Sequence, residues 1–296
     1  MTRWPRAGAV GLLACALMVG PGCASARAKR AKRTPVIAGH GTAPTVESQD
    51  KALASALLRL EAHPSADAHD AVSDEYRRLG LLEQAYAHAS AAAAMTPGDA
   101  SAYERRARIW RDWGFPSTGM ADAARAVFFA PASASAHNTW GTLLAATGWL
   151  DAARQEFERA RTLDPNASYA STNLCYLAFV AGNAPSAATE CRRALALDEH
   201  SPVARNNLAL SLAAAGDYSA AEREFLASAD TMTGHYNAGV AYLAAGRYSD
   251  ARASFEAVSL AHPLGRIARA RAEQARTLAN STIALGPRAA AAERRQ

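Results

Sequence analysis

Apolar residues recur at helical spacing in short segments from residue 48 to about residue 285, whereas residues 23–47 show no periodic apolar face. Two residue types divide the patterned region at an interval of 34 residues. The interval separates five glycines (Gly80, Gly114, Gly148, Gly182 and Gly216) and three prolines (Pro97, Pro131 and Pro165). A glycine suits the end of a first helix, where the chain turns left-handed, and a proline stops the second helix. The pattern therefore predicts six helix–turn–helix repeats over residues 66–265.

Further helices are expected on both sides of the repeats. Residues 48–65 predict an N-terminal capping helix, with Ala54, Leu57, Leu58 and Leu60 on its apolar face. Residues 266–285 predict a C-terminal capping helix with arginines on its outer face, because a terminal repeat needs a polar outer surface. Residues 286–296 are expected to form a disordered tail. Gly216 and Gly246 are only 30 residues apart, so the fifth repeat should have a shortened second helix or connection.

The repeat over residues 134–167 has the clearest pattern. Its recurring positions are Trp140, Gly141, Gly148, Ala153, Phe157, Ala160 and Pro165. This pattern resembles the tetratricopeptide repeat (TPR) family. The resemblance implies an all-α, right-handed superhelical solenoid of about six repeats with capping helices. It also implies that the first helix of each repeat lines a concave groove that holds a protein segment.

The composition agrees with an all-helical fold. Alanine accounts for 76 of the 296 residues, and 7% of the residues are aromatic. Alanine loses no side-chain entropy in a helix, whereas a β-sandwich or barrel needs β-branched and aromatic residues. The net charge of +5 is smaller than the charge of the seven basic residues at positions 3, 6, 27, 29, 30, 32 and 33. The rest of the chain is slightly acidic, which argues against a nucleic-acid partner.

The N-terminus is typical of an exported protein. Two arginines precede an apolar run over residues 7–20, which is too short to span a bilayer and predicts a signal peptide over residues 1–22. Cys23 follows Gly-Pro-Gly in an arrangement that resembles a lipobox, and in this interpretation Cys23 is lipidated. Residues 12–15 match the lipobox letters better but leave too short an apolar core. Ordinary cleavage after residue 26 would instead release a soluble protein.

Residues 23–47 predict a disordered basic tether, because they cannot bury enough apolar surface to offset chain entropy. Residues 27–33, the basic run RAKRAKR, either contact anionic lipid headgroups or form a solvated linker. Ala24, rather than Asp, after the cysteine indicates sorting to the outer membrane if the cell is Gram-negative.

The sequence contains no phosphate-binding loop, dinucleotide-binding, zinc-hydrolase or nucleophile-elbow motif. We therefore expect no enzyme activity and no cofactor. The nearest approach to a metal-ligand spacing is interpreted as solvated surface, not a metal site; it consists of His63, His69, Asp67 and Asp70.

Two cysteines lie in the two helices of one repeat. Cys175 and Cys191 occupy its small-residue packing positions, where they form either a disulfide or two buried thiols. An enzyme with Cys175 as nucleophile is a rival hypothesis, which the expected burial of that position argues against.

The inward positions of the first helices predict an uneven partner-binding groove. Its first part is charged and its second part is rich in amides and aromatics. The expected contact residues are Arg77, Arg108, Arg111, Tyr169, Asn173, Tyr176, Phe179, Asn206, Asn207, Tyr236 and Asn237. In the TPR family an Asn at the place of Asn173, Asn207 and Asn237 holds a peptide backbone or carboxylate, since an amide both donates and accepts. The alternatives are that each Asn stabilises its own helix pair and that the charged residues are solvated.

These features predict a non-enzymatic protein-binding scaffold, lipid-anchored at the periplasmic face of the outer membrane. Exported lipoproteins of this build resemble the pilotin and the Tad/Flp or type IV pilus-assembly TPR lipoproteins, and residues 203–221 look like the Tad-type members. The resemblance implies a role in helping a secretin or pilus subunit to assemble. The alternative is a generic periplasmic TPR adaptor for cell-wall or secretion proteins.

Overall fold

The computed structural model describes residues 50–293 except residue 229, with side chains as far as residue 280. All fourteen elements in these residues are α-helices. The described residues form two compact units, which meet in sequence between Pro165 and Asn166. The signal peptide, Cys23 and the tether over residues 23–47 lie outside the described residues, as do residues 294–296 of the tail.

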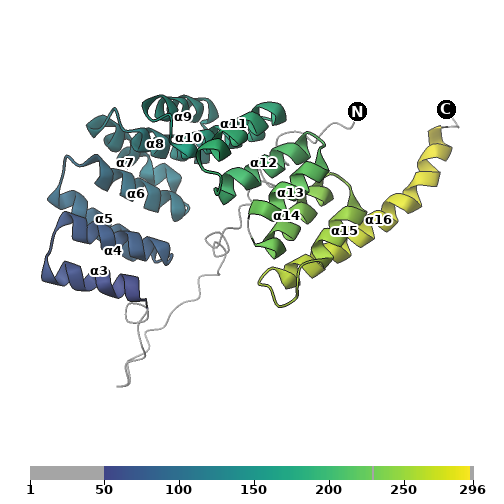
Figure 1. Ribbon diagram of the computed structural model, residues 1–296, viewed down its shortest axis with the longest axis horizontal. Helices are drawn as coiled ribbons and strands as arrows, with labels where there is room; N and C mark the ends of the chain where they lie inside the picture. Colours follow the sequence, from purple (N-terminus) through teal and green to yellow (C-terminus); the bar gives the residue numbers. More distant parts are fainter. Residues whose placement is uncertain (1–49, 229, 294–296) are drawn as a thin grey trace, which may run out of the picture. The chain divides into compact units, whose positions relative to one another are not determined.

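The N-terminal unit is a capping helix followed by three helical hairpins (Figure 1, purple to teal). Its helices are α3 (Lys51–Ala62), α4 (Ala66–Arg78), α5 (Leu82–Met95), α6 (Ala100–Asp112), α7 (Pro116–Phe129), α8 (Ala134–Ala146) and α9 (Leu150–Leu163). Helix α3 packs on α4, and each hairpin packs on the next. The helices α4, α6 and α8 are the first helices of their repeats.

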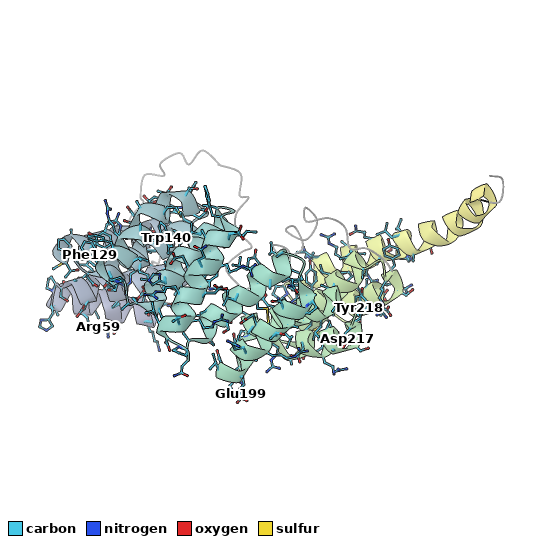
Figure 2. The ribbon with its side chains drawn as sticks, turned by 90° about the horizontal axis from the view of Figure 1, so that it is seen from above. Arg59, Phe129, Trp140, Glu199, Asp217 and Tyr218 are labelled. Carbon is cyan, nitrogen blue, oxygen red and sulfur yellow. A yellow bond between two sulfur atoms is a disulfide. The ribbon has the colours of Figure 1, made fainter. Side chains whose placement is uncertain are left out.

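The C-terminal unit contains three hairpins and a long final helix (Figure 1, teal through green to yellow, from α10 onward). Its helices are α10 (Ser168–Val180), α11 (Ala184–Leu197), α12 (Pro202–Ala214), α13 (Tyr218–Ser228), α14 (Thr231–Ala244), α15 (Tyr248–Glu256) and α16 (Gly265–Glu293). Figure 2 labels Glu199, which lies between two hairpins, and Asp217, which lies in the turn of the second hairpin. The repeat architecture predicted from the sequence is confirmed in both units.

The glycines that mark the repeat end the first helices, as predicted. Six glycines have a left-handed φ between 73° and 90°: Gly80, Gly114, Gly148, Gly182, Gly216 and Gly246. Among the described residues no other residue type has a positive φ. Only glycine adopts this conformation without steric cost, so these positions fix where each hairpin turns.

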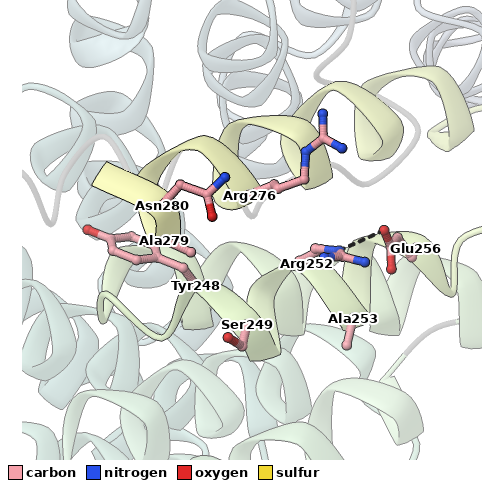
Figure 3. Close-up of a pocket in the computed structure, with 8 residues that line it drawn as sticks. All are labelled: Tyr248, Ser249, Arg252, Ala253, Glu256, Arg276, Ala279 and Asn280. Carbon is pink, nitrogen blue, oxygen red and sulfur yellow. Dashed lines mark hydrogen bonds and ion pairs between the residues drawn. The ribbon is translucent and has the colours of Figure 1, made fainter. Parts of the chain in front are cut away.

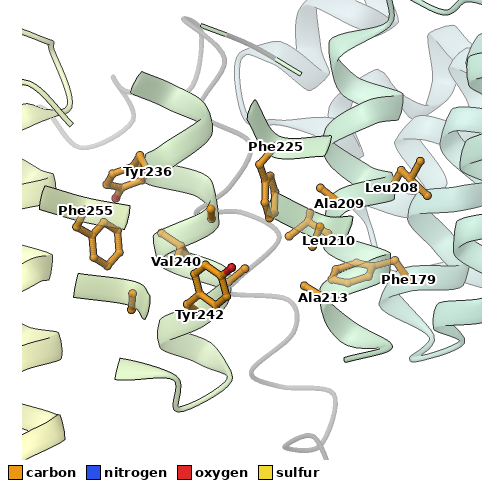
Figure 4. Packing of buried hydrophobic residues seen from close by; sticks show 14 of the residues in the cluster. Phe179, Leu208, Ala209, Leu210, Ala213, Phe225, Tyr236, Val240, Tyr242 and Phe255 are labelled. Carbon is orange, nitrogen blue, oxygen red and sulfur yellow. The ribbon is translucent and has the colours of Figure 1, made fainter. Parts of the chain in front are cut away.

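The two helices of a hairpin pack through one small residue on the first helix and one residue sixteen positions later on the second. A Cβ atom on Gly141 would lie 2.6 Å from the ring of Phe157, and one on Gly239 would lie 2.7 Å from the ring of Phe255. Phe255 belongs to a buried cluster that extends through the C-terminal unit (Figure 4). The missing side chain therefore makes room for the ring, and the ring fills the core.

Three details differ from the sequence-based expectation or refine it. The N-terminal capping helix buries Leu53 and Ala56, whereas Leu58 is 66% exposed, so its apolar face is rotated from the one we predicted. The fifth repeat is shortened in its second helix, since α13 has 11 residues where α5, α7, α9 and α11 have 14. Helix α16 covers the range 266–285 and continues to Glu293, into the segment that we expected to be disordered.

Candidate partner-binding surfaces

Charged side chains join the first helices of the N-terminal unit. Arg105 on α6 reaches back to α4, where its guanidinium nitrogens lie 2.7 Å from a carboxylate oxygen of Asp70 and 3.1 Å from one of Asp74. Arg77 on α4 reaches forward, with Nε 2.7 Å from the carboxylate of Asp112. Such partners are 31 or 35 residues apart, close to one repeat of 34, so they meet on facing turns of neighbouring first helices.

The same network continues from α6 to α8. Glu104 is buried and pairs with Arg108. It also accepts hydrogen bonds from the hydroxyls of Ser135 (2.6 Å) and Thr139 (3.0 Å) on α8. Because a buried carboxylate is costly unless it is fully bonded, these contacts favour one register between the two helices.

The arginines that we expected to contact a partner are engaged in this network. Arg111 bonds to Asp112 on its own helix segment and donates from Nη1 to Thr142 on α8 at 3.3 Å. Burial lowers the pKa of Arg108, an effect that Glu104 opposes and that Arg77 and Arg111 reinforce. These contacts give Arg77, Arg108 and Arg111 a structural role, since they hold α4, α6 and α8 together. A role of the same arginines in binding a partner stays a prediction.

In the C-terminal unit, several expected contact residues are buried. Phe179 and Tyr236 are 4% and 7% exposed and belong to the buried cluster, where Tyr236 meets Phe255 edge to face (Figure 4). Asn207 and Asn237 are both 5% exposed. Asn237 on α14 donates from Nδ2 to the amide oxygen of Asn206 on α12 at 3.0 Å, again across 31 residues. As placed here, these four side chains are not accessible to a partner on the helix surface, which corrects their predicted role.

Four of the expected contact residues remain partly exposed. Tyr169, Asn173 and Tyr176 lie on α10, and Asn206 lies on α12. Residues 169, 173 and 176 follow each other by four and three positions, so their side chains share one face of α10. We call these four residues the amide–aromatic face. It combines aromatic area with amide donors and acceptors, a combination suited to a peptide.

Cys175 and Cys191 form a disulfide between α10 and α11, with Cα atoms 5.2 Å apart. They occupy the same pair of packing positions that Gly141 and Phe157 occupy one repeat earlier, and both cysteines are fully buried. Since Cys175 is bonded and inaccessible in this structure, it cannot serve as a nucleophile there.

A surface cavity of about 390 Å³ lies between α15 and α16, away from the predicted contact residues (Figure 3). Its arginines are already paired, Arg252 with Glu256 at 2.9 Å and Arg276 with Glu273 at 2.6 Å. The cavity could not be predicted from the sequence, because the cavity depends on how α16 packs against α15.

Two further results concern metals and membranes. Within the described residues, no cluster of three or more His, Cys, Asp or Glu side chains is arranged to hold a metal ion. His69 instead contacts His88 on α5, with their Nδ1 atoms 3.0 Å apart, a contact that the sequence analysis missed. None of the helices described between residues 50 and 293 has both the length and the apolar character that crossing a bilayer requires.

Comparison with known proteins identifies the fold. No family model matches the sequence, and no curated protein matches it. Among solved structures, a chain of the APC/C hetero-tetramer Cut9–Hcn1 is 16% identical with a TM-score of 0.64; the match covers 74% of this chain and 45% of that one, so this chain spans less than half of its length.

Two bacterial structures are also similar. A thermophilic TPR protein of Thermus thermophilus is 18% identical with a TM-score of 0.55, covering 60% of this chain and 100% of that one. PilW, described as a widely conserved type IV pilus biogenesis factor, is 21% identical with a TM-score of 0.55, covering 64% and 90%. At these identities the likeness concerns the fold: the chain is built as TPR proteins are.

Proposed function

We propose that this protein is a non-enzymatic scaffold of the cell envelope that holds a protein partner on its TPR hairpins. It is exported through a signal peptide over residues 1–22 and anchored by a lipid on Cys23, at the periplasmic face of the outer membrane. The observation that carries the proposal is the amide–aromatic face of Tyr169, Asn173, Tyr176 and Asn206, whose side chains are partly exposed on the first helices.

The compartment is supported by chemistry within the fold. The disulfide between Cys175 and Cys191 lies in the core of a hairpin, and disulfides persist in oxidising compartments such as the bacterial periplasm. A chain that folded in a reducing cytosol would leave two buried thiols at this place.

The partner class is proposed as a subunit of a pilus or secretion machine, such as a secretin or pilin. The likeness in fold to the type IV pilus biogenesis factor PilW supports this choice over other envelope roles. The alternative is a generic periplasmic adaptor for cell-wall or secretion proteins. The protein recovered with the scaffold after crosslinking in cells distinguishes the two.

The test of the partner-binding face is a photo-crosslinking residue at position 173, in chains with and without Tyr169→Ala and Tyr176→Ala. We expect one partner to be crosslinked. The yield of crosslinked product should fall about tenfold in the double variant, because aromatic residues often dominate the binding energy of an interface. Tyr248→Ala is the control, since Tyr248 is also partly exposed but lies on α15. Absence of a crosslink from position 173 would place the partner elsewhere on the molecule, and equal capture by the double variant would show that the two tyrosines do not hold the partner, which contradicts the proposed face.

The lipid anchor is tested separately by metabolic labelling with a radioactive fatty acid. We expect label on the wild-type protein and none on Cys23→Ser. An unlabelled wild-type protein with an N-terminus after residue 26 would establish the soluble periplasmic form.

A further inference from the structure

The residue after the turn glycine differs in kind between the two units. In the N-terminal unit it is apolar and bulky: Leu81, Phe115 and Trp149. In the C-terminal unit it is polar: Asn183, Asp217 and Arg247. Since all six positions have the same place in their hairpins, the fold itself does not require an apolar residue there.

Two of these three turn residues are exposed, whereas Leu81 is partly buried and packs against the apolar cluster that includes Leu53 and Val72. Phe115 is 54% exposed and Trp149 is 66% exposed, and Leu150, the next residue, is 37% exposed. Trp113 lies beside Phe115, with ring centroids 6.3 Å apart. Trp113 itself is partly buried. We call the exposed residues Phe115, Trp149 and Leu150 the turn edge. Phe115 and Trp149 are exposed aromatic residues at equivalent positions in successive turns. They therefore form a repeated pattern, whereas exposed apolar residues on an ordinary surface are scattered singly.

Contacts between the first helices show that these turns lie along one edge of the unit. Arg77 forms an ion pair with Asp112 at 2.7 Å. Arg77 is the last residue but one of α4, and Asp112 is the last residue of α6. Arg111 in turn donates a hydrogen bond to Thr142 on α8. The C-terminal ends of the first helices, and the turns that follow them, are therefore neighbours.

The N-terminal segment joins the unit at this same edge. Asp50, which caps the start of α3, forms an ion pair at 2.6 Å with Arg78, the last residue of α4. The chain that precedes Asp50 holds Cys23 and the five basic residues between positions 27 and 33. A lipid at Cys23 and a basic run would both draw this edge, rather than the opposite one, toward an anionic bilayer.

We propose that the turn edge rests on the surface of a phospholipid bilayer, with Phe115 and Trp149 in the interfacial region. This inference rests on the proposed lipid anchor and adds an orientation to it. Aromatic rings partition into the interface between headgroups and acyl chains, where an apolar body and a wet rim are both accommodated. Burying these rings removes apolar area from water without requiring a groove.

The experiment measures flotation of the processed chain, carrying Cys23→Ser, with vesicles of phosphatidylethanolamine and phosphatidylglycerol. The lipid is left out so that the contribution of the turn edge is visible. We expect the wild-type edge to bind, and Phe115→Ser with Trp149→Ser to lower the partition coefficient about tenfold. Vesicles of phosphatidylcholine alone should bind more weakly, because they do not attract the basic run.

The matched control is Phe128→Ser with Phe129→Ser. These rings are 77% and 42% exposed in the same unit, but they lie at the opposite edge, where Phe129 stacks on Tyr103 near the start of α6 (Figure 2 labels Phe129). Circular dichroism checks that all variants are folded. If the double turn-edge variant does not fold, Trp149→Ser alone replaces it in the flotation experiment.

Each outcome decides the proposal. Binding lost only by the turn-edge variants supports it. It is overturned if the Cys23→Ser chain with an unaltered turn edge does not bind vesicles, if the turn-edge variants bind as well as that chain, or if the control loses binding equally. If the turn-edge variants still bind vesicles but no longer crosslink to a protein in cells, the turn edge contacts a protein partner instead. Failure of the lipid anchor or of the amide–aromatic face appears instead in fatty-acid labelling or in crosslinking at position 173.

Discussion

At the scale of single residues, the hairpins depend on how two side chains, sixteen positions apart, share one space. The pairs are Ser73–Ala89, Ala107–Ala123, Gly141–Phe157, Cys175–Cys191, Ala209–Phe225 and Gly239–Phe255. A Phe on the second helix always faces Gly or Ala on the first. Where neither residue is aromatic, the pair is two small side chains or a disulfide. The summed volume of the pair is not constant, since Ala209–Phe225 exceeds Ala107–Ala123 by a phenyl ring, so neighbouring side chains must fill the difference to keep the core close-packed.

Gly141→Ala is predicted to lower the free energy of unfolding by about 1–3 kcal/mol, because the new Cβ would overlap the ring of Phe157. Phe157→Leu in the same chain should recover part of the loss, since it makes room for the added methyl group. Urea denaturation followed by circular dichroism measures both. The control is Gly98→Ala, whose Cβ would meet nothing within 4 Å; a similar loss there would contradict the packing argument.

Replacing both Cys175 and Cys191 by Ala is predicted to lower the free energy of unfolding by about 3 kcal/mol, the value for closing a loop of this length. A reductant should destabilise the wild-type protein and leave the double variant unchanged. Intact mass should rise by two hydrogens when the denatured protein is reduced. A native mass that already equals the reduced mass would show two thiols.

At the scale of elements, the helices of a hairpin also meet through polar pairs nineteen residues apart. The third repeat has His137 and Glu156, with Nδ1 2.6 Å from Oε2, and the fifth has Arg205 and Glu224 at 3.2 Å. The same place in the first repeat holds His69 and His88. Two imidazoles share a hydrogen bond only while at least one ring nitrogen is an acceptor, so this pair is sensitive to acid.

Stability of the first hairpin is predicted to fall as the pH drops from about 7 to 5. Burial lowers the pKa of His88, and the charge of His69 lowers it further. Because the folded-state pKa lies below the ordinary value of 6.5, the unfolded chain takes up the proton first, and stability present above that value is lost below it. His88→Gln should flatten the dependence of the melting temperature on pH. His200→Gln, at a histidine whose side chain is 89% exposed and contacts only the exposed Glu199 in the next position, is the control and should change the dependence little.

The sequence predicts the helices well, because glycine and proline act locally and recur at one interval. It predicts the exposed faces poorly. Arg105, Thr139 and Asn237 occupy one place in their repeats, and each faces the preceding first helix, where it meets Asp74, Glu104 or Asn206. The direction in which these side chains point depends on the register between neighbouring repeats, and a local sequence pattern does not determine that register. For this reason Asn207 and Asn237 were expected in a groove and are buried.

At the scale of the whole chain, both units have buried apolar clusters, but they differ in the further contacts that stabilise them. The first helices of the N-terminal unit are joined by partly exposed ion pairs such as Arg77–Asp112, whereas the C-terminal unit has a continuous buried apolar cluster and the disulfide. In stacked repeats each hairpin depends mainly on its neighbours, so a perturbation should remain largely within the unit that receives it.

Salt and a reductant should therefore act on different halves of the sequence. At molar salt, where charges are screened beyond about 3 Å, amide hydrogen exchange should increase in residues 66–146 more than in residues 168–256. A reductant should increase exchange in α10 and α11 and spread to α12 and α13, which share the buried cluster with Cys175 and Cys191. Mass spectrometry of peptic fragments measures both, with the double cysteine-to-alanine variant as control. Equal responses of both halves to both treatments would mean that the chain unfolds as one cooperative unit rather than hairpin by hairpin.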